Sequence, residues 1–426
     1  MCSYNSFFSQ IMRIKLTAAR RLQQTIELPA SKSISNRALI INALSGGHEM
    51  PQHISDCDDT FVMVRALTQP SDPTDIMAAG TAMRFLSAYY AVTEGTHTIT
   101  GTQRMKQRPI GILADALRAL GAKVEYTEQE GFPPLRITGG KHEGGKLSLK
   151  GNISSQYISA LLMIAPVLQD GLVLELTGDI ISRPYIDLTL QLMTDFGAQA
   201  TWTDERHIEV KPIPYRSTPY YIESDWSAAS YWYQMTALCT NPDAEIILPG
   251  LYRHSSQGDS AVRDLFKSLG VHTAFFKDEN GLECVRLTKG TVTATRMDYD
   301  FINQPDLAQT FAVTCAMLGI PFHFRGLQSL KSKETDRIAA LIRELGKLGY
   351  DIRDAHDSEL IWDGARTAPH RQVAIDTYED HRMAMAFAPC SLTLGDICIN
   401  NPQVVGKSYP KYWEHLTKTG FEIEEL

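Results

Sequence analysis

The sequence predicts an α/β protein with two similar domains, each built from three repeated βαβ-type modules. An amphipathic run that ends in glycine and leads into a strand-like segment occurs five times. The glycines are Gly121, Gly197, Gly270, Gly349 and Gly420, spaced 71 to 79 residues apart. Glycine is common just past a helix C-terminus, where φ is often positive. A length of 426 residues also exceeds what one ordinary core organises.

The copies follow one another along the whole chain. In order, they are "RPIGILADALRALGAKVEY", "RPYIDLTLQLMTDFGAQATW", "GDSAVRDLFKSLGVHTAFF", "KETDRIAALIRELGKLGYDI" and "YPKYWEHLTKTGFEIEE". A sixth, weaker copy at Asp56 to Pro70 lacks the glycine and lies closer to its neighbour, so we expect a shortened first module. A period near 75 residues is too long for a solenoid unit, which favours six modules grouped as two sets of three.

The domain boundaries follow from this grouping. We expect residues 31–224 to form the N-terminal-type domain, and residues 12–30 with 225–426 to form the C-terminal-type domain. The chain would therefore cross twice between the domains, the second time near "YYIESDWSAAS". Residues 1–11 fit no module and are expected to be a loose extension.

Composition restricts the class of protein. Hydrophobic residues make up 43% and charged residues 21% of the chain, values of a globular protein, and no window resembles a membrane span or a signal peptide. We therefore expect a cytoplasmic protein without a membrane partner. The seven cysteines are scattered without C-x-x-C spacing, which favours reduced thiols over disulfides or zinc. A net charge of −8 argues against nucleic-acid binding.

Cationic and hydroxyl residues recur where helices are expected to begin. The segments are "SKSISNR", "AGTAMR", "QRP", "SSQ", "SRP", "KETDR", "DHR" and "GKSYP". A helix N-terminus offers free N–H donors and a positive dipole end, and neighbouring Lys, Arg or Ser side chains complete an anion site. One such start is usually an ordinary cap, but eight of them favour a ligand with several anionic groups.

Two carboxylates do not fit a purely anion-binding site. Asp306 opens an apolar run and could simply cap its helix. Glu334 lies in "KETDR", where we expect a helix to begin near Ser332 or Lys333, and on this evidence alone the segment favours a solvated, charged helix end over a site. Beside bound anions, carboxylates are costly unless they transfer protons or orient a hydroxyl.

Common cofactor and nucleophile motifs are absent from the sequence. "GGKHEGGKLS" resembles a phosphate-binding loop, but Leu147 occupies the position of the metal-binding hydroxyl, and the flanking segments predict a hairpin. Neither a dinucleotide fingerprint, nor G-x-S-x-G, nor metal-ligand histidine spacing occurs. His381 reads either as a residue near the anions or as packing.

Nine segments, in one order, resemble the 5-enolpyruvylshikimate-3-phosphate (EPSP) synthase family from about Met12 onward. They are "LPASKSISNRAL", "GTAMRFL", "RMKQRPIGILADAL", "SSQYISALLM", "SRPYIDLTL", "PDLAQTFAV", "KETDRIAAL", "EDHRMAMAF" and "GKSYPKYW". The resemblance implies an inside-out barrel in each domain, with helices packed inside sheets and the active site between the domains. It implies transfer of an enolpyruvyl group from phosphoenolpyruvate to the 5-hydroxyl of shikimate 3-phosphate by addition and elimination, in aromatic amino acid biosynthesis. We expect no metal or organic cofactor, and we expect the protein to be a monomer.

The resemblance also assigns roles to individual residues. Shikimate 3-phosphate would contact Ser33, Arg37, Ser154, Ser155, Gln156, Ser182, Tyr185, Asp306, Ser329 and Lys333. Phosphoenolpyruvate would contact Lys32, Gly80, Arg108, Gln156, Arg337, Arg382 and Lys407. Asp306 would accept the hydroxyl proton, and Glu334 with Lys32 would manage the proton at the methylene carbon. On this reading "KETDR" is part of a site.

The chain departs from the family pattern at three positions. Ala78 replaces a usual Asn, Phe85 a usual Pro, and Ser329 a usual Asn. No charge is lost, so the activity is still expected, while the response to inhibitors of the family stays open.

Two other functions are compatible with this kind of chain. A related enolpyruvyl transferase acts on UDP-N-acetylglucosamine and typically uses a loop cysteine, but no cysteine lies between Cys57 and Cys239. A non-catalytic anion-binding protein of the same fold would not need Asp306 and Glu334.

Overall fold

Five four-stranded sheets carry the predicted repeat in the computed structural model, which describes residues 12–19, 21–47, 49–371 and 373–426. Each sheet begins with a parallel pair and continues with two antiparallel strands. In four of the sheets the last two strands follow the second helix of the module, which gives the order β-α-β-α-β-β, whereas the last sheet takes one of these strands, Arg13–Thr17, from the start of the chain. The predicted extension at residues 1–11, including Cys2, lies outside the described residues.

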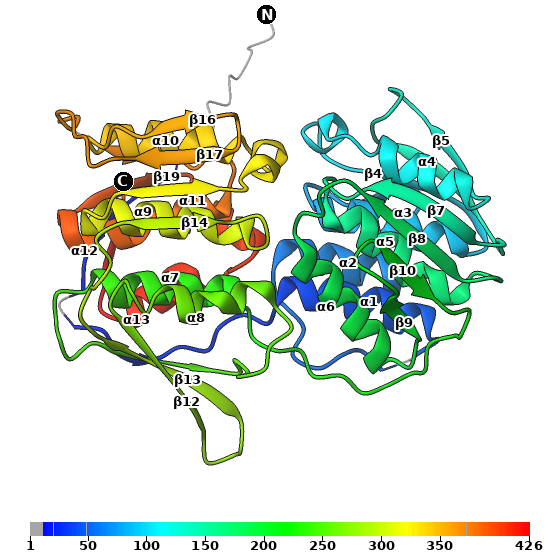
Figure 1. Cartoon of the computed structure of the whole chain (residues 1–426), viewed down its shortest axis with the longest axis horizontal. Helices are drawn as coiled ribbons and strands as arrows, with labels where there is room; N and C mark the ends of the chain where they lie inside the picture. Colours follow the sequence, from blue (N-terminus) through cyan, green and yellow to red (C-terminus); the bar gives the residue numbers. More distant parts are fainter. Residues whose placement is uncertain (1–11, 20, 48, 372) are drawn as a thin grey trace, which may run out of the picture.

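Two of the sheets belong to the first domain, on the right in Figure 1, and three to the second. The first domain contains β3 (Thr74–Asp75), β4 (Gly95–Thr100), β6 (Leu135–Gly139) and β5 (Lys123–Tyr126), then β7 (Gly145–Lys150), β8 (Leu172–Thr177), β10 (His207–Val210) and β9 (Ala200–Trp202). The second contains β2 (Gln23–Thr25), β11 (Glu245–Pro249), β13 (Glu283–Lys289) and β12 (Val271–Lys277), then β14 (Met297–Asp300), β15 (Phe322–Arg325), β17 (Glu359–Trp362) and β16 (Arg353–Ala355), then β18 (Ala374–Ile375), β19 (Ile397–Asn400), β1 (Arg13–Thr17) and β20 (Glu422–Glu425).

Each module contributes one inner and one outer helix. The inner helices are α1 (Lys32–Leu44), α3 (Gly80–Val92) and α5 (Ser155–Ile164) in the first domain, and α7 (Trp226–Leu238), α9 (Ala308–Leu318) and α11 (His381–Phe387) in the second. They are buried nearly all round, and in α7 only Ser227 is not buried. A helix without a polar face belongs in the interior, so the modules wrap sheets around helices.

The outer helices have one buried face. They are α2 (Asp58–Thr68), α4 (Gly111–Ala119), α6 (Arg183–Asp195), α8 (Val262–Leu265), α10 (Arg337–Lys347) and α13 (Tyr412–Lys418), and a short α12 (Ser391–Leu394) follows α11. The predicted glycines terminate five of these runs with φ between 84° and 104°. A residue with a side chain is strained at such φ angles. Glycine therefore recurs at this position in five copies of the repeat.

Two hydrophobic cores divide the chain. One contains Ala30 to Ile222, and the other contains the residues up to Leu28 and those from Trp226 onward. The two crossing segments pair at Ala30 and Ser224. We propose that the domain boundaries lie there, between residues 30 and 31 and between 224 and 225. Within the described ranges, no helix combines the length and apolarity needed to traverse a bilayer.

The structure confirms one local expectation and corrects two. The first module is shortened to the point that isolated bridges, such as Gln52 with Tyr221, replace its sheet. The predicted hairpin around residues 139–148 is wrong, because β6 and β7 belong to different sheets. The helix expected at Ser332 or Lys333 begins only at Arg337, because the Asp336 side chain caps it by accepting from the Ala339 amide at 3.1 Å.

Candidate active site between the domains

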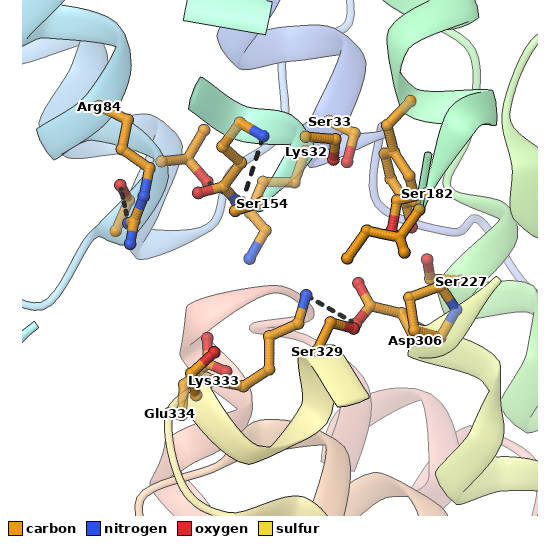
Figure 2. Close-up of a pocket in the computed structure, with 18 of the residues that line it drawn as sticks. Lys32, Ser33, Arg84, Ser154, Ser182, Ser227, Asp306, Ser329, Lys333 and Glu334 are labelled. Atoms are coloured by element: carbon orange, nitrogen blue, oxygen red, sulfur yellow. Dashed lines mark hydrogen bonds and ion pairs between the residues drawn. The ribbon is translucent and has the colours of Figure 1, made fainter. Parts of the chain in front are cut away.

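A cavity of about 630 Å³ lies between the two domains. In Figure 2, Lys32, Ser33, Arg84, Ser154 and Ser182 of the first domain face Asp306, Ser329, Lys333 and Glu334 of the second. Neither domain encloses this space alone. Any ligand that fills the cavity therefore contacts side chains from both halves of the chain.

The inner helices converge on this cavity through their N-termini. Lys32, Gly80 and Ser155 begin the three inner helices of the first domain, and all three line the cavity. In the second domain, Asp306 lies in the 3₁₀ turn η4 (Pro305–Leu307) that leads into α9, His381 begins α11, and both also line the cavity. The positive ends of several helix dipoles therefore point toward one space, which favours anionic ligands.

The structure places nearly all the predicted site residues on the cavity wall. Those that line it are Lys32, Ser33, Arg37, Gly80, Arg108, Ser154, Ser155, Gln156, Ser182, Tyr185, Asp306, Ser329, Lys333, Glu334, Arg337 and Arg382. Lys407 does not line it. The Lys407 ammonium donates to the Glu379 carbonyl at 3.1 Å, and the Lys407 carbonyl accepts from Lys32 Nζ at 3.4 Å. Its contact with phosphoenolpyruvate stays a prediction.

Asp306 is surrounded by three cations. Its carboxylate accepts from Arg337 Nη1 at 2.9 Å and Arg382 Nη2 at 3.1 Å, and it lies 3.4 Å from Lys333 Nζ. Burial raises the pKa of Asp306, but Arg382, Lys333 and Arg337 outweigh it and hold the pKa well below its usual value. The reading of Asp306 as a simple helix cap is wrong, because α9 makes no side-chain cap bond at its N-terminus.

Glu334 shares Arg337 with two other carboxylates. Arg337 Nη2 donates to Glu334 at 2.9 Å, while Arg337 Nε donates to Asp380 at 2.6 Å and Nη1 to Asp306. The Arg337 side chain is only 2% exposed. Burial raises the pKa of Glu334, but neighbouring cations, with Arg337 first and Arg108 and Lys32 behind it, hold the pKa well below its usual value. "KETDR" is therefore a loop in the site and not a solvated helix end.

The first domain supplies cations of a different kind, of which Arg37 and Arg84 are buried and Arg108 is half-buried. In the described part of the chain, Arg37, Arg84 and Arg108 make no ion pair with a carboxylate. Arg37 instead donates to the hydroxyls of Thr189 at 2.8 Å and Ser159 at 3.0 Å, and burial lowers its pKa to about 10. A buried cation without a counterion is costly, so these arginines favour an anionic ligand.

Arg84 and Arg108 converge at the start of α3. A Cβ atom on Gly80 would lie 2.5 Å from Arg108 Nη1 and 2.9 Å from Arg84 Nη1, so glycine leaves the space that both guanidinium groups occupy. Burial, and then the neighbouring Arg84, lowers the pKa of Arg108. Sequence reasoning did not name Arg84 as a site residue, although it is the cation in the quoted "AGTAMR" motif.

Asp59, a further lining residue, was also missed, and His381 lines the cavity too. Asp59 lies 3.3 Å from Lys32 Nζ, and although burial lowers the pKa of Lys32, Asp59 is the largest of the charges that raise it above its usual value. In the sequence, Asp59 belongs to "DCDDT", a segment that looks like any acidic helix start. Neither ring nitrogen of His381 has a hydrogen-bond partner among the described residues. Sequence reasoning left His381 between an anion-site role and packing.

Comparisons with known proteins agree with this geometry. A family model described as EPSP synthase (3-phosphoshikimate 1-carboxyvinyltransferase) matches residues 65–416. A curated protein from Bacteroides fragilis named 3-phosphoshikimate 1-carboxyvinyltransferase is 60% identical over 413 residues, covering 97% of this chain and 99% of the relative. Another, from Sulfurovum sp., is 35% identical over 431 residues, covering 95% and 98%.

Solved structures share the fold at low sequence identity. EPSP synthase from Acinetobacter baumannii superposes with a TM-score of 0.77 at 20% identity, covering 97% of this chain and all of that chain. The enolpyruvyl transferase NikO from Streptomyces tendae gives 0.72 at 16% identity, covering 98% and 99%. Both likenesses concern the two-domain fold.

Proposed function

The chain belongs to the EPSP synthase family, and on that premise we propose that it transfers the enolpyruvyl group of phosphoenolpyruvate to the 5-hydroxyl of shikimate 3-phosphate. One observation carries the proposal. Buried arginines without a carboxylate partner on one side of the cavity face two carboxylates held by cations on the other. The first set suits substrate phosphates and carboxylates, and the second suits proton transfer.

The reaction balances as an addition followed by an elimination. The acceptor oxygen bonds to C2 of phosphoenolpyruvate, its proton leaves, and a proton adds to the C3 methylene to give a methyl group. Phosphate then departs with the bridging oxygen, and the methyl group loses a proton to restore the double bond. The products are 5-enolpyruvylshikimate 3-phosphate and inorganic phosphate.

We assign the acceptor proton to Asp306. Its depressed pKa makes it a weak base in the empty cavity. Because Arg382, Lys333 and Arg337 cause that depression, anionic substrates that neutralise these cations would raise the pKa of Asp306 as they bind. The base would therefore strengthen only when the site is filled.

We assign the proton at the methylene carbon to Glu334 together with Lys32. The two groups lie on opposite domains, and the charge of each acts on the pKa of the other. Arg37 and the hydroxyls of Ser154, Ser155 and Ser182 would hold the sugar acid and its phosphate. Arg108, Arg337 and Arg382 would hold phosphoenolpyruvate, with Arg84 as an added candidate beside Arg108.

The alternative acceptor, UDP-N-acetylglucosamine, has less support. Among the described residues the cavity wall contains no cysteine, whereas the related transferase typically uses one. A non-catalytic anion-binding protein would not explain two carboxylates on the cavity wall that are paired with Arg337, Arg382 and Lys333. We also propose a cytoplasmic monomer, since one chain lines the whole cavity and both substrates are phosphorylated metabolites.

Acceptor-dependent phosphate release tests the function. We expect phosphate to form from phosphoenolpyruvate with shikimate 3-phosphate and not with UDP-N-acetylglucosamine. Release with only the nucleotide sugar would establish the alternative. Binding of both anions without release would support the non-catalytic protein.

A further inference from the structure

Arg37 is a buried arginine of the cavity wall that only uncharged groups hold in the part of the chain that the structure describes. It lies on α1 and is 2% exposed. Its Nε donates to the Thr189 hydroxyl at 2.8 Å and its Nη2 to the Ser159 hydroxyl at 3.0 Å, while Nη1 donates to the Ser33 carbonyl at 2.9 Å. These partners belong to α6, α5 and α1, so the packing of three helices fixes the guanidinium group.

The two hydroxyl groups support each other. Their oxygens lie 2.8 Å apart, and the Thr189 hydroxyl donates to the Tyr185 backbone carbonyl at 2.8 Å. A hydroxyl has one hydrogen and two lone pairs. Because the Thr189 hydrogen goes to that carbonyl, the Ser159 hydrogen points at Thr189, and both oxygens keep a lone pair for Arg37. Since both side chains are fully buried, water does not compete for these lone pairs.

The face of the guanidinium group is covered as well. Cζ of Arg37 lies 5.2 Å from the centre of the Phe85 ring, a distance at which an aromatic face attracts a cation. Phe85 is fully buried in α3, at the position where the family usually has proline. An aromatic ring, like a hydroxyl, carries no net charge. Arg37 is therefore held at its edge and over its face without being neutralised.

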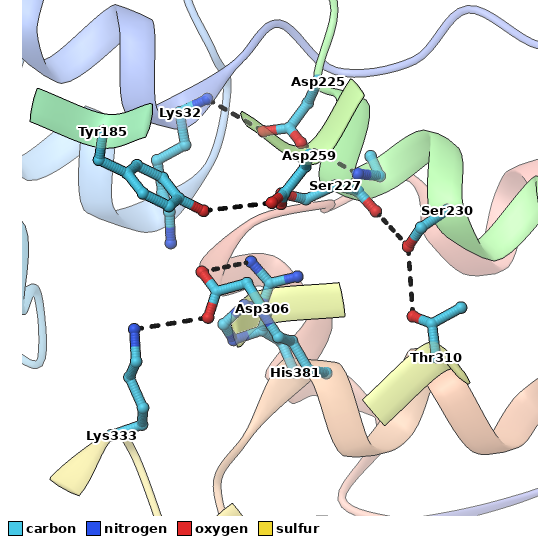
Figure 3. A network of polar contacts seen from close by, with 12 residues as sticks. Lys32, Tyr185, Asp225, Ser227, Ser230, Asp259, Asp306, Thr310, Lys333 and His381 are labelled. Carbon is cyan, nitrogen blue, oxygen red and sulfur yellow. Dashed lines mark hydrogen bonds and ion pairs between the residues drawn. The ribbon is translucent and has the colours of Figure 1, made fainter. Parts of the chain in front are cut away.

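Cations on the opposite wall are held differently. Arg337 donates to three carboxylates, and Lys333 lies 3.4 Å from the Asp306 carboxylate, as Figure 3 shows. Carboxylate partners compensate these charges before a ligand arrives. Arg37 keeps its charge, and because each terminal nitrogen has two hydrogens and donates one, one hydrogen remains on each. Such a pair can bind two oxygens of one anion.

We propose that Thr189 and Ser159 are positioning residues, whose neutral hydroxyls orient Arg37 and leave its charge to the anionic group of the sugar-acid substrate. This inference rests on the proposed function and deepens it. A carboxylate in either place would hold the arginine but would cancel its charge. An apolar side chain would leave a buried N–H without a partner.

Thr189→Val tests the proposal, because valine keeps the shape of the side chain and removes the hydroxyl. We expect KM for shikimate 3-phosphate to rise about tenfold, as for the loss of a buried hydrogen bond to a charged group. Turnover and KM for phosphoenolpyruvate should change less than about twofold, since Arg37 is assigned to the acceptor. Thr189→Ser keeps the hydroxyl and should stay within about twofold of the wild type. Similar rises in both KM values, or equal values for Thr189→Val and Thr189→Ser, would overturn the proposal.

A double-mutant cycle shows whether Thr189 acts through Arg37. Arg37→Met removes the charge and should raise KM for shikimate 3-phosphate more than Thr189→Val does. Adding Thr189→Val to Arg37→Met should then change that KM less than about twofold, because the group that Thr189 orients is gone. If the two effects multiply, Thr189 acts independently of Arg37 and the proposal is wrong.

Thr236→Val is the matched control. Thr236 is a fully buried threonine of the inner helix α7, in the second domain, and donates to the Trp232 carbonyl four residues earlier at 2.8 Å. Both KM values should stay within about twofold. A selective rise in this variant too would show a general effect of the substitution and would count against the proposal.

Two further measurements keep the outcome decisive. If Thr189→Val does not fold, Ser159→Ala carries the same test, with the same selective rise expected. Wild-type turnover is measured first: its absence would overturn the proposed function and this inference together, whereas turnover with unchanged variants would overturn this inference alone.

Discussion

At the scale of single residues, the site depends on carboxylates whose charge is fixed by neighbouring cations. The side chains of Asp306 and Glu334 are 17% and 19% exposed, and both have a pKa held below the usual value although partial burial raises it. Asp380 stabilises Arg337, and Arg337 in turn contacts both of them. Any change to one charge therefore alters the protonation of its neighbours.

Glu334→Gln should separate binding from catalysis. The amide keeps the size of the side chain and can still accept from Arg337, so ligand affinity should change little. Turnover should fall about a hundredfold or more, because a positioned proton-transfer group is lost. Calorimetric binding and steady-state kinetics on the same preparation would check this. Unchanged turnover in the folded variant would remove Glu334 from the proton-transfer step.

His381 should stay neutral throughout the working pH range. Burial, and then Lys32, lowers its pKa well below the usual value. An unfolded histidine binds a proton at about pH 6.5 and the folded one does not, so stability should decline as pH falls below about 6.5. NMR of the ring, assigned with a His381→Asn variant, should show no titration between pH 6 and 8. A midpoint near 6.5 would contradict the burial argument.

At the scale of elements, the sequence predicted helices better than the loops between them. The repeat and its glycines identified α4, α6, α10 and α13 because amphipathic periodicity is a local property. The start of α10 was misplaced by about one turn. The seven residues of "KSKETDR" are all charged or polar and fit a solvated first turn, and only tertiary contacts of Arg337 with Asp306 and Asp380 hold the segment as a loop.

The residues of the candidate site were likewise only partly predictable from the sequence. Cations in helix-start motifs were found from the sequence, since their residue types indicate anion binding. Asp59 was missed, because an aspartate near a helix start usually caps or is solvated, and only the fold brings it beside Lys32. Thr189 was missed, because a threonine inside a helix has no sequence signal of its own, and only the fold brings it beside Arg37. The family resemblance supplied residue roles that spacing alone left open.

The cap of α10 should control the loop that carries Glu334. Asp336→Ala removes the side chain that accepts from the Ala339 amide, at a cost of about 1 kcal/mol. We expect faster amide hydrogen exchange in the first turn of α10 and in residues 333–336, with unchanged exchange in α4 as the internal reference. Asp336→Asn should restore protection, since Asn also caps. Equal exchange in all three proteins would show that the cap does not hold the loop.

At the scale of the whole molecule, the cavity is completed only from both domains. Lys32, Arg37, Arg84 and Arg108 lie on one side, and Lys333, Arg337 and Arg382 on the other. Facing cations repel each other in the empty protein, and an anionic ligand between them removes that repulsion. At one rim the domains touch in this structure, where Arg104 lies 3.4 Å from the Glu334 carbonyl.

Shikimate 3-phosphate alone should therefore contract the protein. Small-angle scattering with and without a saturating amount should show a smaller radius of gyration in the bound sample, because the ligand bridges both halves. Shikimate without its phosphate is the matched control and should have a weaker effect. Identical radii for all three samples would exclude closure driven by this ligand.

The central claim is that this cavity joins an acceptor hydroxyl to C2 of phosphoenolpyruvate and expels phosphate with the bridging oxygen. Phosphoenolpyruvate labelled with ¹⁸O at the bridging position tests it directly, with the released phosphate analysed by mass spectrometry. We expect phosphate to form only when shikimate 3-phosphate is present, and we expect the released phosphate to carry the label. Unlabelled phosphate, with ¹⁸O kept on the carbon product, would mean attack at phosphorus and would contradict the account.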